Sequence, residues 1–251
     1  MLERLVLVDV LTFFLVFCRV GSAVMVLPGF GEAMVSPQVR LLLALAVTLV
    51  VAPVVGPTLA GTPGGLEVLL ITEIGVGLFV GAAARMMMSA LQVAGNVIAF
   101  QTSLAGAMAF DPMSNTQTPV TGTFLSTLGL VLVFVADLHH LMLAGIVESY
   151  RLFVPGQLPP IGDFAEAATR IVGDSFRIGM QLSAPFLLVG ILVTVGMGLL
   201  SRLMPQVQVF FLAVPVQIML GLLVLALTLS FGMTWFLEGF EQSLRTLYYG
   251  G

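Results

Sequence analysis

Residues 104–120 read LAGAMAFDPMSNTQTPV and interrupt a chain that is otherwise almost continuous apolar sequence. The pair Asp111-Pro112 predicts the end of a helix, because proline lacks a backbone N–H and broken backbone at membrane depth needs protein or water as its partner. Deformable apolar side chains surround this turn: Met108, Phe110 and Met113. Such a turn can exclude water when packed and yield when pushed, so it suits a seal over an aqueous passage. An ordinary loop between helices is the alternative.

The residues before this loop predict a helix with one polar side. Ser89, Gln92, Asn96 and Ser103 recur at helical spacing beside small residues. Because lipid cannot satisfy these groups, we expect this side to face protein, with Gln92 and Asn96 in contact with other helices or subunits.

Composition sets the class of protein. Hydrophobic residues make up 59% of the 251 residues and charged residues only 9%, and the apolar runs match a bilayer core, so we predict an all-α, polytopic membrane protein. All nine basic residues are arginine and the net charge is -4, which argues against a nucleic-acid partner. One cysteine and two histidines are too few soft ligands for a structural metal site, so we expect no metal and no cofactor.

The N-terminal part of the chain predicts helices that pack on each other. Residues 5–27 form an apolar run containing Arg19, which we expect to face a protein partner because a charge against lipid costs at least ~2.5 kcal/mol. A second helix is predicted over 39–52, after Ser36-Pro37 as its cap, ending at Pro53 and Pro57. A third run, 66–84, contains Glu73 together with Gly77 and Gly81, a spacing that lets another helix approach closely.

The later runs add one polar cluster. Residues 120–147 contain Asp137, His139 and His140, which suit either a proton relay or, as we favour, an interfacial cluster satisfied by its neighbours. Two further runs cover 178–200, with a kink expected at Pro185, and 207–237. The hydrophilic stretch 151–177 is too short for a catalytic domain, and no catalytic motif is found. We therefore predict one domain over 1–251 without a separable soluble part, and no enzyme activity.

Arginines at the ends of the predicted runs give an orientation. Most fall on one side: Arg40, Arg85, Arg151, Arg170, Arg177 and Arg245. Arg4 and Arg202 fall on the other. The positive-inside rule then predicts a cytoplasmic C-terminus and an outward N-terminus, provided that the runs on either side of Arg85 are separate helices.

Several separated motifs together resemble one family. They are CRVGSAVMVLPGFGEAMVSPQVR, QVAGNVIAFQTSLAGAMAFDPMSN, DLHHLMLAGIVESY and LLSRLMPQVQVFFLAVPVQIMLGL, with Glu73 and its following glycines between the first two. This pattern covers nearly the whole chain and resembles the flagellar biosynthetic protein FliR family, which includes the corresponding subunit of virulence-type injectisomes. The resemblance implies an export-gate subunit of the type III secretion apparatus in the bacterial inner membrane, within the flagellar basal body.

The resemblance also implies partners and a fold that hydropathy does not show. The partners would be FliP and FliQ, then FlhB and FlhA, and the substrates unfolded flagellar proteins. Bent helical hairpins would form a spiral with these subunits around a central pore, with much of the assembly raised out of the plane of the lipid membrane. The pore plug would comprise Gly106, Met108, Phe110, Asp111, Pro112, Met113 and Asn115. Intramembrane or inter-subunit polar contacts are expected at Arg19, Glu73, Gln92, Asn96 and Asp137. The alternatives are the injectisome subunit and a proton-coupled transporter that uses Arg19, Glu73, Asp137 and the histidines.

Overall fold

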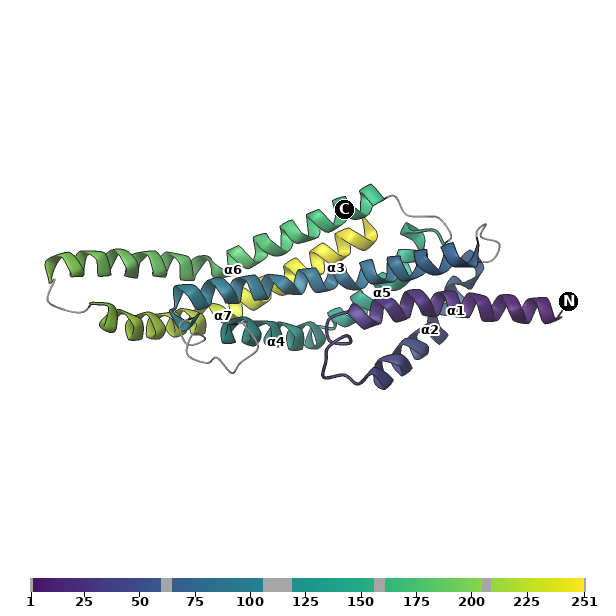
Figure 1. Cartoon of the computed structure of the whole chain (residues 1–251), viewed down its shortest axis with the longest axis horizontal. Helices are drawn as coiled ribbons and strands as arrows, with labels where there is room; N and C mark the ends of the chain where they lie inside the picture. The colour runs from purple at the N-terminus through teal and green to yellow at the C-terminus, as the bar shows by residue number, and fades with distance from the viewer. Residues whose placement is uncertain (1, 60–64, 106–118, 156–160, 205–208, 251) are drawn as a thin grey trace. The chain divides into compact units, whose positions relative to one another are not determined.

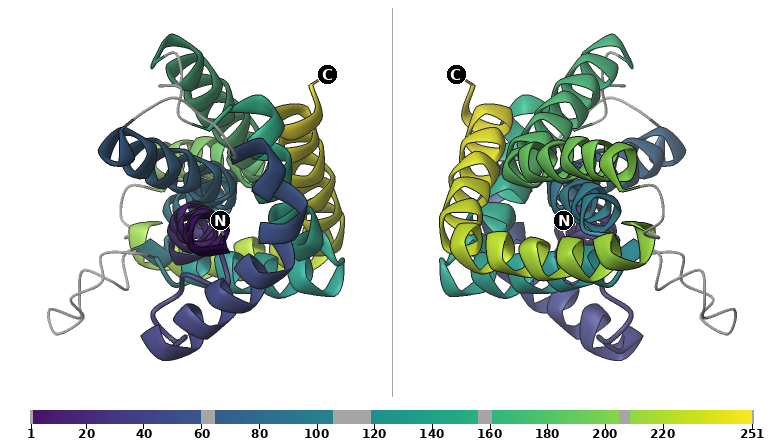
Figure 2. Two further views of the ribbon diagram at one scale, coloured as in Figure 1. Left: turned by 90° about the vertical axis from the view of Figure 1, so that its right-hand side faces the viewer. Right: turned by 90° about the vertical axis from the view of Figure 1, so that its left-hand side faces the viewer.

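The computed structural model describes residues 2–59, 65–105, 119–155, 161–204 and 209–250. These residues fold into helices without any strand (Figures 1 and 2), which confirms the predicted all-α class. The helices are α1 (Leu2–Val26), α2 (Pro37–Leu59), α3 (Leu66–Gln101), α4 (Val120–Val135), α5 (Leu138–Leu152), α6 (Ile161–Leu203) and α7 (Val209–Tyr249).

The start of α2 agrees with the sequence, but its end does not. The backbone N–H of Val39 donates to Ser36 Oγ at 3.4 Å, so Ser36 caps the helix that begins at Pro37. The helix does not stop at Pro53 or Pro57 but continues to Leu59. That predicted end is wrong, since neighbouring groups in a helix-rich membrane protein can satisfy the carbonyls that a proline leaves free.

Helix α3 is a single helix of 36 residues, which corrects the predicted separation at Arg85. At 1.5 Å per residue it is about 54 Å long, well beyond a hydrocarbon core of about 30 Å. Arg85 lies outside the core and bonds Glu32 at 2.9 Å, so it does not interrupt the helix. A helix of this length must tilt, bend or extend beyond the bilayer.

The single run predicted over 120–147 is in fact two helices. Helices α4 and α5 are separated by a break at Asp137, where the backbone is left-handed with φ of 58°, and they meet at 77°. This bend could not be predicted from hydropathy, because both arms are apolar.

Helices α6 and α7 are longer than the predicted apolar runs. Helix α6 has 43 residues and α7 has 41, so most of the hydrophilic stretch before residue 178 is the first part of α6. Pro185 and Pro215 lie inside these helices, and both helices continue through them.

Four helices of the described chain are long and apolar enough to cross a membrane, namely α2, α3, α6 and α7. They become five if the bent pair α4 and α5 forms one span. The chain is therefore a multi-pass membrane protein. The orientation predicted from arginines rested on a break at Arg85, and because α3 is continuous, its basis is wrong.

The helices pack into two compact units. One unit comprises residues 1–87, 133–172 and 240–251, and the other comprises 88–132 and 173–239. Helices α3, α6 and α7 each contribute residues to both units, so neither unit is a continuous piece of sequence.

In the first unit α1 crosses α3 at two glycines, as their spacing predicted. A Cβ added at Gly77 would overlap Ser22 Oγ and the carbonyl oxygen of Arg19. A Cβ at Gly81 would lie 2.7 Å from the carbonyl oxygen of Ala23. Backbones this close require residues without side chains, and they gain dispersion contacts where the hydrophobic effect gives little.

This crossing predicts opposite effects for two neighbouring substitutions. Gly77→Ala should destabilise the chain by about 1–3 kcal/mol, because its methyl group must push α1 away. Gly75→Ala is the matched control, since a Cβ there has no atom within 4 Å, and it should stabilise the helix by about 0.5–1 kcal/mol. Thermal denaturation of the purified chain in detergent measures both. Equal losses in the two variants would contradict the close crossing.

Candidate functional site

A buried ion pair joins α1 to α3. Arg19 Nε donates to Glu73 Oε2 at 2.7 Å, and Arg19 Nη2 donates to Glu73 Oε1 at 2.8 Å. Both side chains are almost completely buried, at 1% and 0% exposure. The pair is therefore bidentate, the geometry in which a planar guanidinium binds a carboxylate most strongly.

Helix α5 supplies the remaining contacts of this arginine. Arg19 Nη1 donates to Ser149 Oγ at 3.2 Å, and Nη2 also donates to the carbonyl oxygen of Phe153 at 3.3 Å. The guanidinium lies 3.8 Å from the centre of the Tyr150 ring, a cation–π contact. The Arg19 side chain thus contacts α3 and α5 at once, and we call these five residues the ion-pair cluster.

The arrangement explains why a charge can stand inside an apolar unit. Removing two ions from water costs several kcal/mol each, and the mutual attraction offsets that cost only with good geometry and further hydrogen bonds. Both carboxylate oxygens of Glu73 and three guanidinium nitrogens of Arg19 have partners. Any separation of α1, α3 and α5 would leave one of these charges unpaired.

An aromatic cluster continues from the same place. The ring of Phe153 stacks on Phe164 at 4.9 Å, and Phe79 stands edge-on to Phe164 at 4.3 Å. Because Phe153 also accepts from Arg19 through its carbonyl, the end of α5, the start of α6 and the middle of α3 are fixed beside the ion pair.

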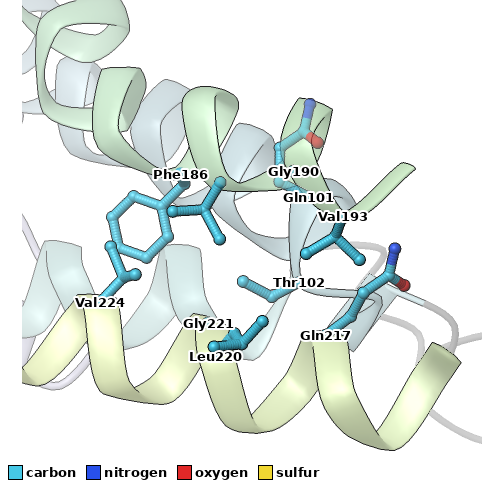
Figure 3. Close-up of a pocket in the computed structure, with 10 residues that line it drawn as sticks. Gln101, Thr102, Phe186, Gly190, Val193, Gln217, Leu220, Gly221 and Val224 are labelled. Carbon is cyan, nitrogen blue, oxygen red and sulfur yellow. The ribbon is translucent and has the colours of Figure 1, made fainter. Parts of the chain in front are cut away.

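The second unit holds the C-terminal end of α3 between α6 and α7 (Figure 3). Ser103 follows the helix with a left-handed φ of 59°, and its hydroxyl donates to Gln217 Oε1 on α7. Thr102 packs so closely on Gly221 that a Cβ there would overlap its side chain. Gln101 packs in the same way on Gly190 of α6. We call these contacts the α3-end seat.

A very small cavity lies within the α3-end seat. A cavity of about 10 Å³ lies among its residues, at the lower limit for one water molecule. The lining comes from all three helices and includes the apolar side chains Phe186, Val193 and Leu220 (Figure 3). The end of α3 is therefore tightly packed up to the residues where the 104–120 stretch begins.

The far side of that stretch is also attached to α3. Thr121 Oγ1, at the start of α4, donates to the carbonyl oxygen of Gly95 at 2.8 Å. The backbones of Gly95 and Gly122 approach so closely that a Cβ at Gly95 would overlap Gly122. Packing contacts thus hold both flanks of the predicted loop.

The other predicted site residues do not lie together in the structure. Gln92 and Asn96 are half-buried on α3, and Asn96 Oδ1 is buried without a hydrogen bond to the described residues. Asp137 is exposed at the bend between α4 and α5, and its Oδ1 lies 3.8 Å from His140 Nδ1. The predicted plug residues lie outside the described residues: Gly106, Met108, Phe110, Asp111, Pro112, Met113 and Asn115.

Sequence reasoning missed five contributors. Ser149 and Tyr150 appear in the sequence analysis only at the end of the motif DLHHLMLAGIVESY, although a serine and a tyrosine close to a helix end are groups that a buried arginine can use. Gln217 and Gly221 appear only within LLSRLMPQVQVFFLAVPVQIMLGL, and Phe153 is not predicted to have any role. Their partners lie 114 to 134 positions away in the sequence, and no local pattern reveals such pairings.

These features define a multi-pass helical membrane protein with charges paired inside its helix packing. The chain belongs to the family described as bacterial export proteins, family 1, whose sequence model matches residues 10–243.

Curated relatives agree with this assignment. The chain is 41% identical to the flagellar biosynthetic protein FliR of Caulobacter vibrioides over 225 residues, covering 88% of this chain and 90% of the relative. It is 31% identical to FliR of Bacillus subtilis over 227 residues, covering 87% and 86%. It is also 26% identical to the Yop proteins translocation protein T of Yersinia pestis over 241 residues, covering 90% and 89%.

The ion-pair cluster predicts unequal effects for two similar substitutions. Glu73→Gln should destabilise the chain by about 3–5 kcal/mol, because it leaves the Arg19 charge buried and uncompensated. Glu32→Gln is the control, since the pair Glu32–Arg85 is 41% and 47% exposed, and it should cost at most about 1 kcal/mol. The yield of folded chain from membranes and its thermal midpoint in detergent measure the difference. Comparable losses would show that the buried pair is no more important than a surface pair.

Proposed function

We propose that this chain is the FliR-type subunit of a flagellar type III protein export gate in the bacterial inner membrane. The family match over residues 10–243 supports this most strongly, together with relatives aligned over most of both chains. The multi-pass helical fold agrees with it. The FliR relatives at 41% and 31% identity favour the flagellar over the injectisome form, whose relative is 26% identical.

The proposed role is structural rather than enzymatic. The chain would assemble with FliP and FliQ, and then with FlhB and FlhA, around a passage for unfolded flagellar proteins. Only 6% of the most apolar stretch of α7 and 17% of that of α6 is buried within the described chain, against 44% of that of α3. Such exposed apolar faces need lipid or partner helices to cover them, which supports a subunit that completes its packing in a complex.

We also propose that residues 1–251 act as one export-gate domain. Helices α3, α6 and α7 each contribute to both compact units. The two units therefore do not correspond to separate stretches of sequence, which supports a single domain.

The loop from Gly106 to Asn115 is the proposed closure of the passage. Gly106 permits a bend, Pro112 prevents continuation of a helix, and Phe110 with its neighbouring methionines supplies apolar bulk. The flanks at Ser103 and Thr121 are held by hydrogen bonds. A loop fixed at both flanks can be displaced by a substrate and still return to the same place.

A proton relay through Arg19 and Glu73 is the less favoured function. Both Glu73 oxygens accept hydrogen bonds from Arg19, so the carboxylate is already engaged in a contact between helices. Complex assembly should therefore suffer more in Glu73 variants than any proton-dependent step.

Removing the plug should make the resting membrane permeable. Deletion of 106–115, or Phe110→Ala, should admit ions and small solutes, because apolar side chains no longer empty the constriction of water. Protein export should survive in part, since substrates must displace this loop anyway. Conductance and small-molecule uptake in cells that carry the assembled complex measure the effect. A membrane as tight as with the intact chain would show that the loop is merely a connection.

The α3-end seat predicts a weaker leak from a distant substitution. Gly221→Val should push Thr102 away from α7, shift the flank of the loop and give a leak smaller than that of the deletion. Gly198→Val is the matched control, because a Cβ at Gly198 of α6 has no atom within 4 Å. The same uptake assay, with the amount of assembled complex held equal, compares them. If the Gly221→Val chain gave no leak, or if Gly221→Val and Gly198→Val gave equal leaks, a role for the α3-end seat in closure would be contradicted.

A further inference from the structure

Both histidines of the chain lie in one turn. They are His139 and His140, at the start of α5 directly after Asp137. One ligand atom from each of these three residues lies within 4.8 Å of the other two. We call this group the bend cluster, because it stands where α4 and α5 meet at 77°.

The surrounding structure orients one of the imidazoles. The His139 ring stacks on Phe134 with 5.1 Å between centres and 14° between planes, and Phe134 in turn contacts Phe30 edge-on. His139 Nδ1 is buried, yet it makes no hydrogen bond to the described residues. A buried polar atom normally has a hydrogen-bond partner, so the unpaired Nδ1 of His139 points to a bound ligand.

The other two donor residues, Asp137 and His140, lie close together and are exposed. His140 Nδ1 lies 3.8 Å from Asp137 Oδ1, and these side chains are 72% and 78% exposed. Donors that share one zinc ion lie about 2.0–2.2 Å from it, so they must come closer than 4.8 Å to one another. The His140 ring lies 4.1 Å from the His139 ring, centre to centre. Because Asp137 and His140 are exposed, rotation about their side-chain bonds can supply the remaining approach.

The donor set selects a class of ligand. Two imidazole nitrogens and one carboxylate oxygen suit zinc and other divalent first-row transition metals, whereas calcium and magnesium prefer oxygen alone. Counting residue types predicted no metal site, because it considered histidine and cysteine without the carboxylate. The left-handed backbone at Asp137 brings that carboxylate to the two imidazoles.

We propose that Asp137, His139 and His140 bind one divalent transition-metal ion of the zinc class, with water completing its coordination. The ion would fix the start of α5, since it links the residue before that helix to its first turn. This site does not depend on the export function proposed above.

Cobalt titration tests the proposal directly. The full-length chain, purified in detergent with an affinity tag free of histidine, should bind one Co²⁺ with the visible absorption of a nitrogen-ligated ion, and Zn²⁺ should displace it. His140→Gln and Asp137→Asn should each weaken binding by at least about tenfold, a loss no smaller than that seen when outer-shell partners are removed. Glu148→Gln is the matched control, because Glu148 lies on α5 but pairs with Arg151 at 3.0 Å.

Histidine-selective NMR gives an independent reading, since the chain offers only two imidazoles. Both ring signals should shift at the same Zn²⁺ concentration, and Asp137→Asn should move that midpoint upward. Each variant is accepted only if it elutes and denatures like the unaltered chain without metal; His139→Gln is the substitute if His140→Gln fails this. Absence of binding, a shift of one ring alone, or equal affinities in Asp137→Asn and Glu148→Gln would overturn the proposal.

Discussion

The buried pair Arg19–Glu73 is the interaction on which the packing of the first unit depends. Charges at 1% and 0% exposure are tolerated only while α1, α3 and α5 remain together, because separation leaves an ion without water or partner. The glycine crossing of α1 on α3 brings the two backbones close enough for the bidentate contact. The ion pair and the close packing of the two helix backbones thus depend on each other.

Helix α3 connects the Arg19–Glu73 pair to the part of the chain proposed to close the passage. Its middle holds Glu73 in one unit, and its end is seated between Gly190 and Gly221 in the other. Exposed apolar faces on α6 and α7 leave those helices to meet lipid or partner subunits. The architecture therefore suits a subunit that is internally fixed along α3 and completed from outside along α6 and α7.

The sequence predicted the helical membrane class, the Ser36 cap and the glycine crossing, because composition, capping and close packing are local properties. It did not predict the length of α3, since a single Arg85 resembles an interruption in hydropathy although a long helix can carry it to the surface. It also missed the bend at Asp137, which depends on one left-handed residue between two apolar arms. Partners such as Ser149 and Gln217 are set by tertiary packing and leave no local pattern.

A double-mutant cycle at Arg19 and Glu73 tests the central claim most directly. The single variants Arg19→Met and Glu73→Leu should each lower the thermal midpoint and the yield of folded chain strongly, because each leaves one buried charge alone. The double variant should recover most of that loss, since an apolar pair of similar volume needs no partner. If the two losses simply add in the double variant, the residues do not act as a pair, and the account of α1, α3 and α5 held together by charge would be contradicted.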